Sequence, residues 1–155
     1  MNNEVTVRDA VPLICEKLSQ GGSVTFTPGG HSMRPMLSGS DPVVLKKYNG
    51  SLKKYDLPFY RRPGTDLYII HRVVGFDKDG SYVLCGDFQL DKEHGVRDED
   101  IIGVVSGYYK GSKYHSVSSL YCRAYARTTP VLRAAHKVYC KIKGVIKKGE
   151  NSEKG

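Results

Sequence analysis

The sequence predicts a mainly β domain, α+β overall, with one helix before it and a basic helical extension after it. Three observations support this fold class. Short alternating or β-branched runs separated by turn residues fill the middle of the chain, both ends show helical periodicity, and the excess of positive charge lies near the C-terminus. A chain of 155 residues is long enough for one ordinary domain and short for two independent cores.

Residues 5–20 have the spacing of an amphipathic helix, and a pair of glycines follows them as a stop signal. The apolar residues that would share one face are Val7, Val11, Ile14 and Leu18. Thr6 or Asp9 could cap the helix, and a cap at Asp9 would place Pro12 in the first turn, where its missing N–H does little harm. We therefore predict that residues 1–22 form a helix that packs on the body.

Residues 23–110 form the predicted β domain. The runs with strand character are 23–27, 43–47, 67–75, 81–84 and 101–109. Turn residues such as Pro-Gly-Gly and Asn-Gly separate these runs. The segment 76–82, with Asp-Lys-Asp-Gly-Ser between two aromatic residues, is the best hairpin signal in the chain.

Residues 111–155 form the predicted basic extension. Residues 1–109 carry 13 basic and 14 acidic side chains, a net charge of −1, whereas residues 110–155 carry 11 basic and two acidic ones, a net charge of +9. Apolar and basic positions alternate at helical spacing on both sides of Pro130, which predicts two short amphipathic helices broken at that proline. From residue 147 the chain is polar, and we expect a disordered end.

The same sequence argues against several other classes of protein. Its longest uncharged apolar stretch in the body, residues 101–109, is about half of the ~20 residues that a membrane-spanning helix needs. The N-terminus lacks the basic start and apolar run of a secretory signal, so the expected location is cytoplasmic. The four cysteines form no Cys-x-x-Cys pair, so we expect free thiols and neither a disulfide framework nor a metal site. No cofactor is predicted.

Ser32 is the first candidate for chemistry, because it follows a glycine-rich turn and precedes an apolar strand. A serine in such a turn can lie exposed beside backbone N–H groups that bind an anion, as a nucleophile and its oxyanion hole require. His71, in an apolar run, has an ordinary pKa of about 6.5 that suits a general base. Asp87, or Asp91 four residues later, could orient the imidazole. Taken alone, each of these residues is better explained as a turn former or a satisfied strand histidine.

Taken together, these pieces resemble a known family. The motifs are Gly30-His-Ser-Met-Arg-Pro-Met-Leu37 with Gly39-Ser-Asp41, then His71-Arg-Val-Val-Gly75, Gly86-Asp87 and Ile102-Gly-Val-Val-Ser-Gly107. In this order, over a little more than half of the chain, they look like the boxes of type I signal peptidases and the related self-cleaving repressor peptidases. The resemblance implies a coiled β-sheet body and a serine endopeptidase that cleaves a peptide or precursor protein through an acyl-enzyme.

The resemblance also implies a role for each matching residue. Ser32 stands at the nucleophile's position, and His71 replaces the lysine base of the bacterial leader peptidases and the repressors, as in the archaeal and endoplasmic-reticulum branch. In that branch an aspartate of the Gly-Asp box works with the histidine, which points to Asp87, with Asp91 as the alternative.

The cleft around the serine can be assigned in the same way. Backbone N–H groups around His31 and Ser32 would stabilise the oxyanion, since Gly30 stands where many signal peptidases carry a second serine. Met33 and Pro35 would shape the turn and line the substrate cleft, which in this family favours small side chains before the cut. Because no membrane anchor precedes the serine box, the sequence favours a dedicated peptidase for a few small precursors over general signal-peptide processing.

The basic extension has three interpretations: it covers the body, it lies on an anionic membrane surface through residues 112–148, or it binds nucleic acid. Basic residues beside an apolar stripe with Tyr121, Tyr125 and Tyr139 favour the membrane, at whose inner face the protein would be peripheral. Nucleic acid is disfavoured because no helix-turn-helix or RNA-binding motif is visible. The alternative to a peptidase is a non-catalytic binding protein that acts through this extension. No feature of the sequence specifies an oligomeric state.

Overall fold

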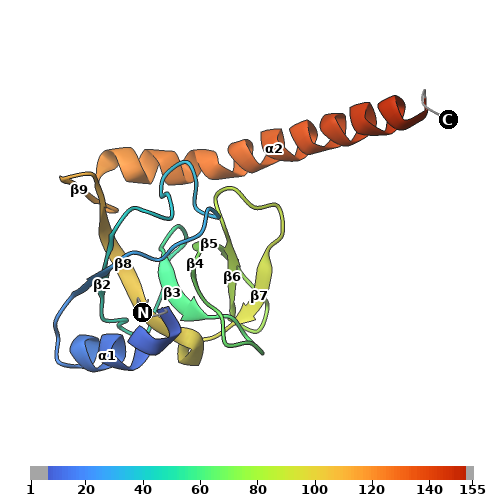
Figure 1. Cartoon of the computed structure of the whole chain (residues 1–155). Coiled ribbons are helices and arrows are strands. Elements are labelled where there is room, and N and C mark those ends of the chain that lie inside the picture. The colour runs from blue at the N-terminus through green and yellow to red at the C-terminus, as the bar shows by residue number, and fades with distance from the viewer. Residues whose placement is uncertain (1–6, 153–155) are drawn as a thin grey trace, which may run out of the picture.

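Two antiparallel sheets form the body of the protein in the computed structural model, which describes residues 7–152 and the side chains of residues 7–142 (Figure 1). The larger sheet has the strand order β1 (Val24–Phe26), β2 (Val43–Lys46), β8 (Ile101–Lys110), β3 (Pro58–Arg61) and β4 (Tyr68–Ile70), and β9 (Lys113–Ser116) also pairs with β8. The smaller sheet contains β5 (Arg72–Phe76), β6 (Tyr82–Cys85) and β7 (Glu93–Val96). Helix α1 (Val7–Ser19), the short 3-10 helix η1 (Asp98–Asp100) and helix α2 (Leu120–Ser152) complete the described chain. This mixed α+β architecture, mainly strands with a helix at each end, confirms the predicted class.

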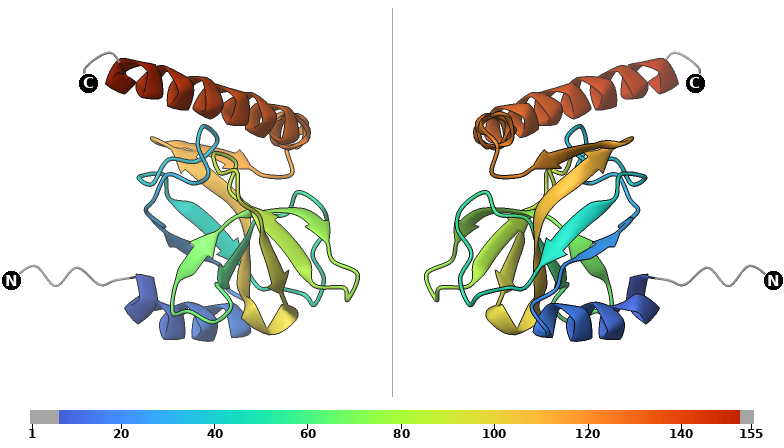
Figure 2. Two further views of the ribbon diagram at one scale, coloured as in Figure 1. Left: turned by 90° about the vertical axis from the view of Figure 1, so that its right-hand side faces the viewer. Right: turned by 90° about the vertical axis from the view of Figure 1, so that its left-hand side faces the viewer.

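Helix α1 closes the core of the larger sheet and lies at the end of the body opposite α2 (Figure 2). Its buried side chains, Val11, Ile14 and Leu18, all belong to the predicted apolar stripe. The helix lies close to β8 at Gly103, where a Cβ atom would be 2.9 Å from Leu18 Cδ1. The packing therefore depends on the absence of a side chain at that position.

The start of α1 excludes Asp9, one of the two predicted caps. The helix begins at Val7, which packs partly buried against the core, and Asp9 lies in the first turn instead of at the cap. Pro12 is consequently inside the helix, beyond its first turn. The other predicted cap, Thr6, is outside the described residues.

Each predicted strand run contains a strand, but the run 67–75 is divided. β4 ends at Ile70 in the larger sheet and β5 begins at Arg72 in the smaller one, so His71 stands where the chain passes between sheets. Three strands were not predicted, β3, β7 and β9, because they are short and carry charged or polar residues. β9 also extends the larger sheet beyond the predicted boundary at residue 110.

The predicted hairpin joins β5 and β6. Asp77 N–H donates to the Ser81 carbonyl at 2.9 Å, and Gly80 has a φ of +85°, in the left-handed region that favours glycine. The Ser81 hydroxyl donates to the Asp79 carboxylate at 2.7 Å. Turn chemistry that can be recognised in the sequence thus fixes this part of the smaller sheet.

The C-terminal extension forms a single helix, so the predicted break at Pro130 is wrong. Pro130 cannot donate to the carbonyl of Ala126, but the Thr129 hydroxyl donates to that oxygen at 2.9 Å and satisfies it. Cys122, Ala126 and Thr129 are buried against the body, and His136 stacks on Phe88. The end of α2 projects beyond the body (Figure 1). The helical backbone continues through Ser152, past the point where we expected disorder, and residues 153–155 are outside the described part.

Candidate active site

Ser32 lies half-buried in a turn between β1 and β2. The turn is entered through Gly29 and Gly30, whose φ angles of +73° and +75° lie in the left-handed region. Met33 and Met36 are buried in the core and fix the turn to the body. Ser32 is thereby held near the surface.

A small groove runs beside Ser32. Its volume is about 50 Å³, and its walls come from the turn, including Met33, and from β4 through residues Tyr68–Ile70. β4 is the last strand of its sheet, so its outer edge has no neighbouring strand among the described residues. Pro35, predicted to line the cleft with Met33, is exposed and does not contribute to this groove.

The Gly-Asp motif packs directly on the serine turn. Phe88 N–H donates to the Ser32 carbonyl at 2.8 Å. A Cβ atom on Gly86 would lie 2.7 Å from the Ser32 carbonyl oxygen and 3.0 Å from Ser32 Cβ, closer than real Cβ contacts allow. Two motifs far apart in the sequence therefore meet, and the glycine is required by the close approach of the two backbones.

His71 is buried beside polar groups of β3 and β7. Its Nδ1 atom is 3.2 Å from the Tyr60 hydroxyl and 3.3 Å from Glu93 Oε1. The Tyr60 hydroxyl donates to Glu93 Oε2 at 2.8 Å, and the Arg62 guanidinium binds both oxygens of the same carboxylate. The imidazole thus faces a carboxylate whose position is fixed by two other side chains.

These surroundings set the protonation states. Burial lowers the pKa of His71, and the negative charge of Glu93 opposes that effect only in part, so the imidazole is neutral at pH 7. Burial alone would raise the pKa of Glu93, but hydrogen bonds from Arg62 and Tyr60 outweigh it and hold this pKa below its ordinary value. An ionised Glu93 favours the tautomer that carries its proton on Nδ1, in which Nε2 holds the lone pair.

Asp87 has a different partner from the predicted one. Its two carboxylate oxygens accept from Arg72, with Nε–Oδ1 at 2.8 Å and Nη2–Oδ2 at 2.7 Å, and both side chains are buried. Asp91 is exposed. Neither aspartate is hydrogen-bonded to His71 in the described chain, and the carboxylate that faces the imidazole is that of Glu93.

The change of partner follows from strand geometry. Arg72 pairs with Cys85 across β5 and β6, and Asp87 comes two residues after Cys85, on the same side as Arg72. His71, one residue earlier, is directed to the opposite side, towards Tyr60 and Glu93. A strong signal for this arrangement was available in Arg72, since an arginine inside an apolar run must pair with a carboxylate when it is buried.

The predicted nucleophile and base occupy neighbouring parts of the fold. Ile70, the residue directly before His71, lines the same groove as Ser32. Ser32 Oγ forms no hydrogen bond with His71 within the part of the chain that the structure describes. Catalytic hydrogen bonds are often long before substrate binds, so the roles of these two residues stay a prediction.

Comparisons of the chain with protein-family models, with curated proteins and with solved structures find no match. Within residues 7–152, no group of three or more His, Cys, Asp or Glu side chains is placed to hold a metal ion. The four cysteines are free, as predicted. The function is therefore inferred from the geometry and electrostatics of the site.

Proposed function

We propose that the protein is a serine endopeptidase of the signal-peptidase type, and that its two-sheet body is the coiled β fold of that family. The observation that carries the proposal is a buried, neutral His71 whose Nδ1 side is held by Glu93, next to the groove that Ser32 lines. A histidine satisfied only for structural reasons would not need an ionised carboxylate fixed by Arg62 and Tyr60.

The proposed chemistry is acyl transfer. Ser32 Oγ attacks a peptide carbonyl while His71 Nε2 takes its proton, and the imidazolium then protonates the leaving amine. Water enters next, gives a proton to His71 and attacks the acyl carbon, and the imidazolium returns that proton to Ser32 Oγ as the acyl bond breaks. The Nδ1 side of the ring faces the Tyr60 hydroxyl at 3.2 Å and Glu93 Oε1 at 3.3 Å, and the negative charge of Glu93 stabilises the imidazolium, the role that the sequence assigned to Asp87 or Asp91.

Backbone geometry supports an oxyanion site at the predicted place. The N–H groups of His31 and Ser32 donate no hydrogen bond within the described residues, so both are available to a developing negative charge. One such donor contributes about 3–4 kcal/mol to the stabilisation of a tetrahedral intermediate. The positive φ angles of the two preceding glycines allow the turn to present these groups.

The groove suggests how a substrate is held. An extended peptide can pair with the free outer edge of β4 and would then pass Ser32. A volume of about 50 Å³ suits a small side chain such as that of alanine next to the cut. We therefore propose a precursor peptide with small residues before the cleavage site as the substrate.

The test is cleavage of a peptide library with alanine at varied positions, read by mass spectrometry. We expect cleavage by the wild type and a loss of about 10³-fold or more in Ser32→Ala and in His71→Ala. Ser38→Ala is the matched control, because Ser38 lines the same groove and has no assigned role. Cleavage by Ser32→Ala at the wild-type rate would reject Ser32 as the nucleophile.

A further inference from the structure

Helix α2 exposes a continuous apolar face that the body does not cover. Its large exposed apolar side chains, between 41% and 84% accessible, are Leu120, Tyr121, Val131, Leu132, Val138, Tyr139 and Ile142. At 100° per residue they fall within an arc of about 120° that extends for roughly 33 Å along the helix. The side that faces the body, with Cys122, Ala126 and Thr129, lies outside this arc. The apolar face is therefore directed to the surroundings of the protein.

A basic flank lies between the apolar face and the side that contacts the body. Its residues are Arg123, Arg127, Lys137 and Lys141, spaced so that they share one side of the helix. Residues 120–142 contain five Arg and Lys and no Asp or Glu. The cations of this flank form no ion pair with any described residue.

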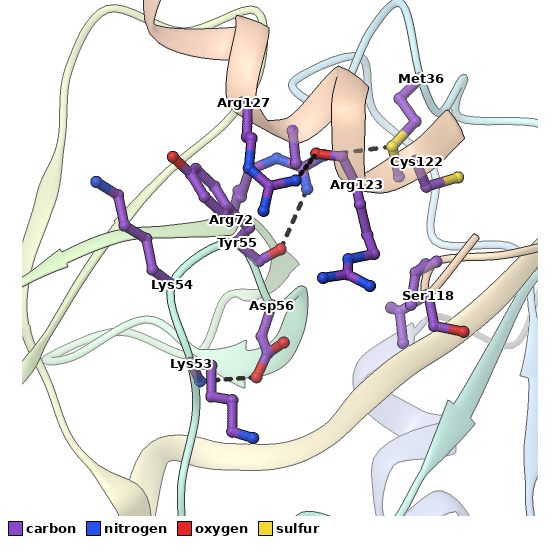
Figure 3. Close-up of a pocket in the computed structure, with 13 residues that line it drawn as sticks. Met36, Lys53, Lys54, Tyr55, Asp56, Arg72, Ser118, Cys122, Arg123 and Arg127 are labelled. Atoms are coloured by element: carbon purple, nitrogen blue, oxygen red, sulfur yellow. Dashed lines mark hydrogen bonds between the residues drawn. The ribbon is translucent and has the colours of Figure 1, made fainter. Parts of the chain in front are cut away.

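The flank continues onto the body at a basic pocket of about 460 Å³ (Figure 3). Lys53 and Lys54 line it opposite Arg123 and Arg127, and none of the four is in an ion pair within the described chain. The one acidic side chain of the lining, Asp56, accepts the backbone N–H of Lys53 at 2.7 Å. Positive charge is thus gathered in a concave site beside the apolar face.

Charge decides what covers this face. A second copy of α2 would bring five more positive charges against the five already present, which disfavours self-association. An anionic bilayer supplies both an apolar interior for the face and negative phosphates for the flank. Within the described residues, no helix is both long enough and apolar enough to cross a membrane. The suitable arrangement is a helix that lies in the plane of the interface.

We propose that α2 docks the protein on an anionic lipid bilayer. Its apolar face enters the boundary between headgroups and acyl chains, while Arg123 and Arg127, with Lys53 and Lys54 of the pocket, receive the lipid phosphates. This proposal does not depend on the peptidase activity, because none of these residues belongs to the candidate active site.

The first test measures co-sedimentation of the full chain with phosphatidylcholine vesicles, with and without phosphatidylglycerol. We expect at least about tenfold tighter binding to the anionic vesicles, and weaker binding as salt is added. Val131→Ser with Val138→Ser, and Arg123→Gln with Arg127→Gln, should each weaken binding by about tenfold or more. The matched controls are Leu13→Ser, an exposed apolar residue of α1, and Lys46→Gln with Lys47→Gln on the body.

The second test uses the absence of tryptophan from the chain. A single tryptophan introduced as Val138→Trp should shift its emission to the blue on anionic vesicles, whereas Leu13→Trp should not. Equal binding to neutral and anionic vesicles, or equal emission shifts at both positions, would overturn the proposal. So would a dimer in lipid-free solution, seen by light scattering, that Val131→Ser with Val138→Ser dissociates, because the face would then belong to a second copy.

Discussion

A buried carboxylate and a half-buried one contact consecutive residues of the chain in different ways. Both carboxylate oxygens of Asp87 accept hydrogen bonds from Arg72, and we call this the closed pair. The side chain of Asp87 is 0% exposed and that of Arg72 is 3% exposed. Glu93 divides its oxygens among Tyr60, Arg62 and His71, and its side chain is 18% exposed. The first pair is saturated, whereas the second environment leaves an imidazole nitrogen available for proton transfer.

The closed pair has an architectural role. Arg72 also donates to the Tyr55 carbonyl at 3.1 Å and to the Met36 sulfur at 3.2 Å, and its guanidinium lies 5.7 Å from the ring centre of Tyr125. These contacts join the serine turn, the loop before β3 and helix α2. Asp87 thus holds these segments together, whereas Glu93 affects the pKa of His71, the proposed base.

The largest expected effect is that of Asp87→Asn. It leaves the charge of Arg72 buried without a counter-ion, so the free energy of unfolding should fall by about 3–5 kcal/mol. Urea denaturation measures this change. Asp66→Asn is the control, because it removes an exposed ion pair with Arg8 and should alter stability little. Equal losses in the two variants would contradict the structural role of Asp87.

Gly86→Ala tests the contact between the Gly-Asp motif and the serine turn. The new Cβ atom would meet the Ser32 carbonyl at 2.7 Å, so one backbone must move, and we expect a loss of about 1–3 kcal/mol together with loss of the proposed activity. Gly75→Ala is the matched control, since the nearest atom to its new Cβ is 3.9 Å away. A Gly86→Ala protein as stable and active as Gly75→Ala would show that the close approach is unimportant.

The parts of the fold that sequence predicted are those fixed by local rules. The apolar stripe of α1 and the hairpin at Gly80 follow from helical spacing and turn chemistry within a few residues. The prediction of a break at Pro130 was wrong because the Thr129 hydroxyl donates to the carbonyl that lacks its usual N–H donor. The presence of a proline does not show whether a neighbouring side chain can supply this hydrogen bond.

Sequence patterns located the candidate residues that lie in local motifs, but not the residue that comes from a distant strand. Ser32 and His71 stand in recognisable motifs, whereas Glu93 lies in a four-residue strand and reaches His71 only through the pairing of distant segments. The run 67–75 has no glycine or proline before residue 75, so no turn signal showed that the chain passes from one sheet to the other at His71. Non-local pairing, which the sequence pattern does not encode, decided which carboxylate meets the base.

Glu93→Gln tests the second carboxylate of this comparison. The variant keeps the shape of the side chain but removes the charge that raises the pKa of His71, so this pKa should fall further below its ordinary value. Stability should fall less than in Asp87→Asn, because Arg62 is partly exposed and can be solvated. NMR titration of the His71 ring measures the shift, with the exposed His94 as an internal control. An unchanged pKa of His71 would remove Glu93 from its proposed role.

The smallest expected effect is the pH dependence that these two groups give to stability. Because burial lowers the pKa of His71, the unfolded chain binds its proton more readily, and stability should decline as pH falls below the ordinary histidine pKa of about 6.5. Glu93, whose pKa is lowered from 4.5, adds a second decline only at more acidic pH. Denaturation midpoints between pH 7.5 and 5.5 should therefore change less in His71→Gln than in the wild type. If His71→Gln follows the wild type, then His71 does not carry this dependence, and a depressed pKa cannot be what keeps the imidazole available as a base.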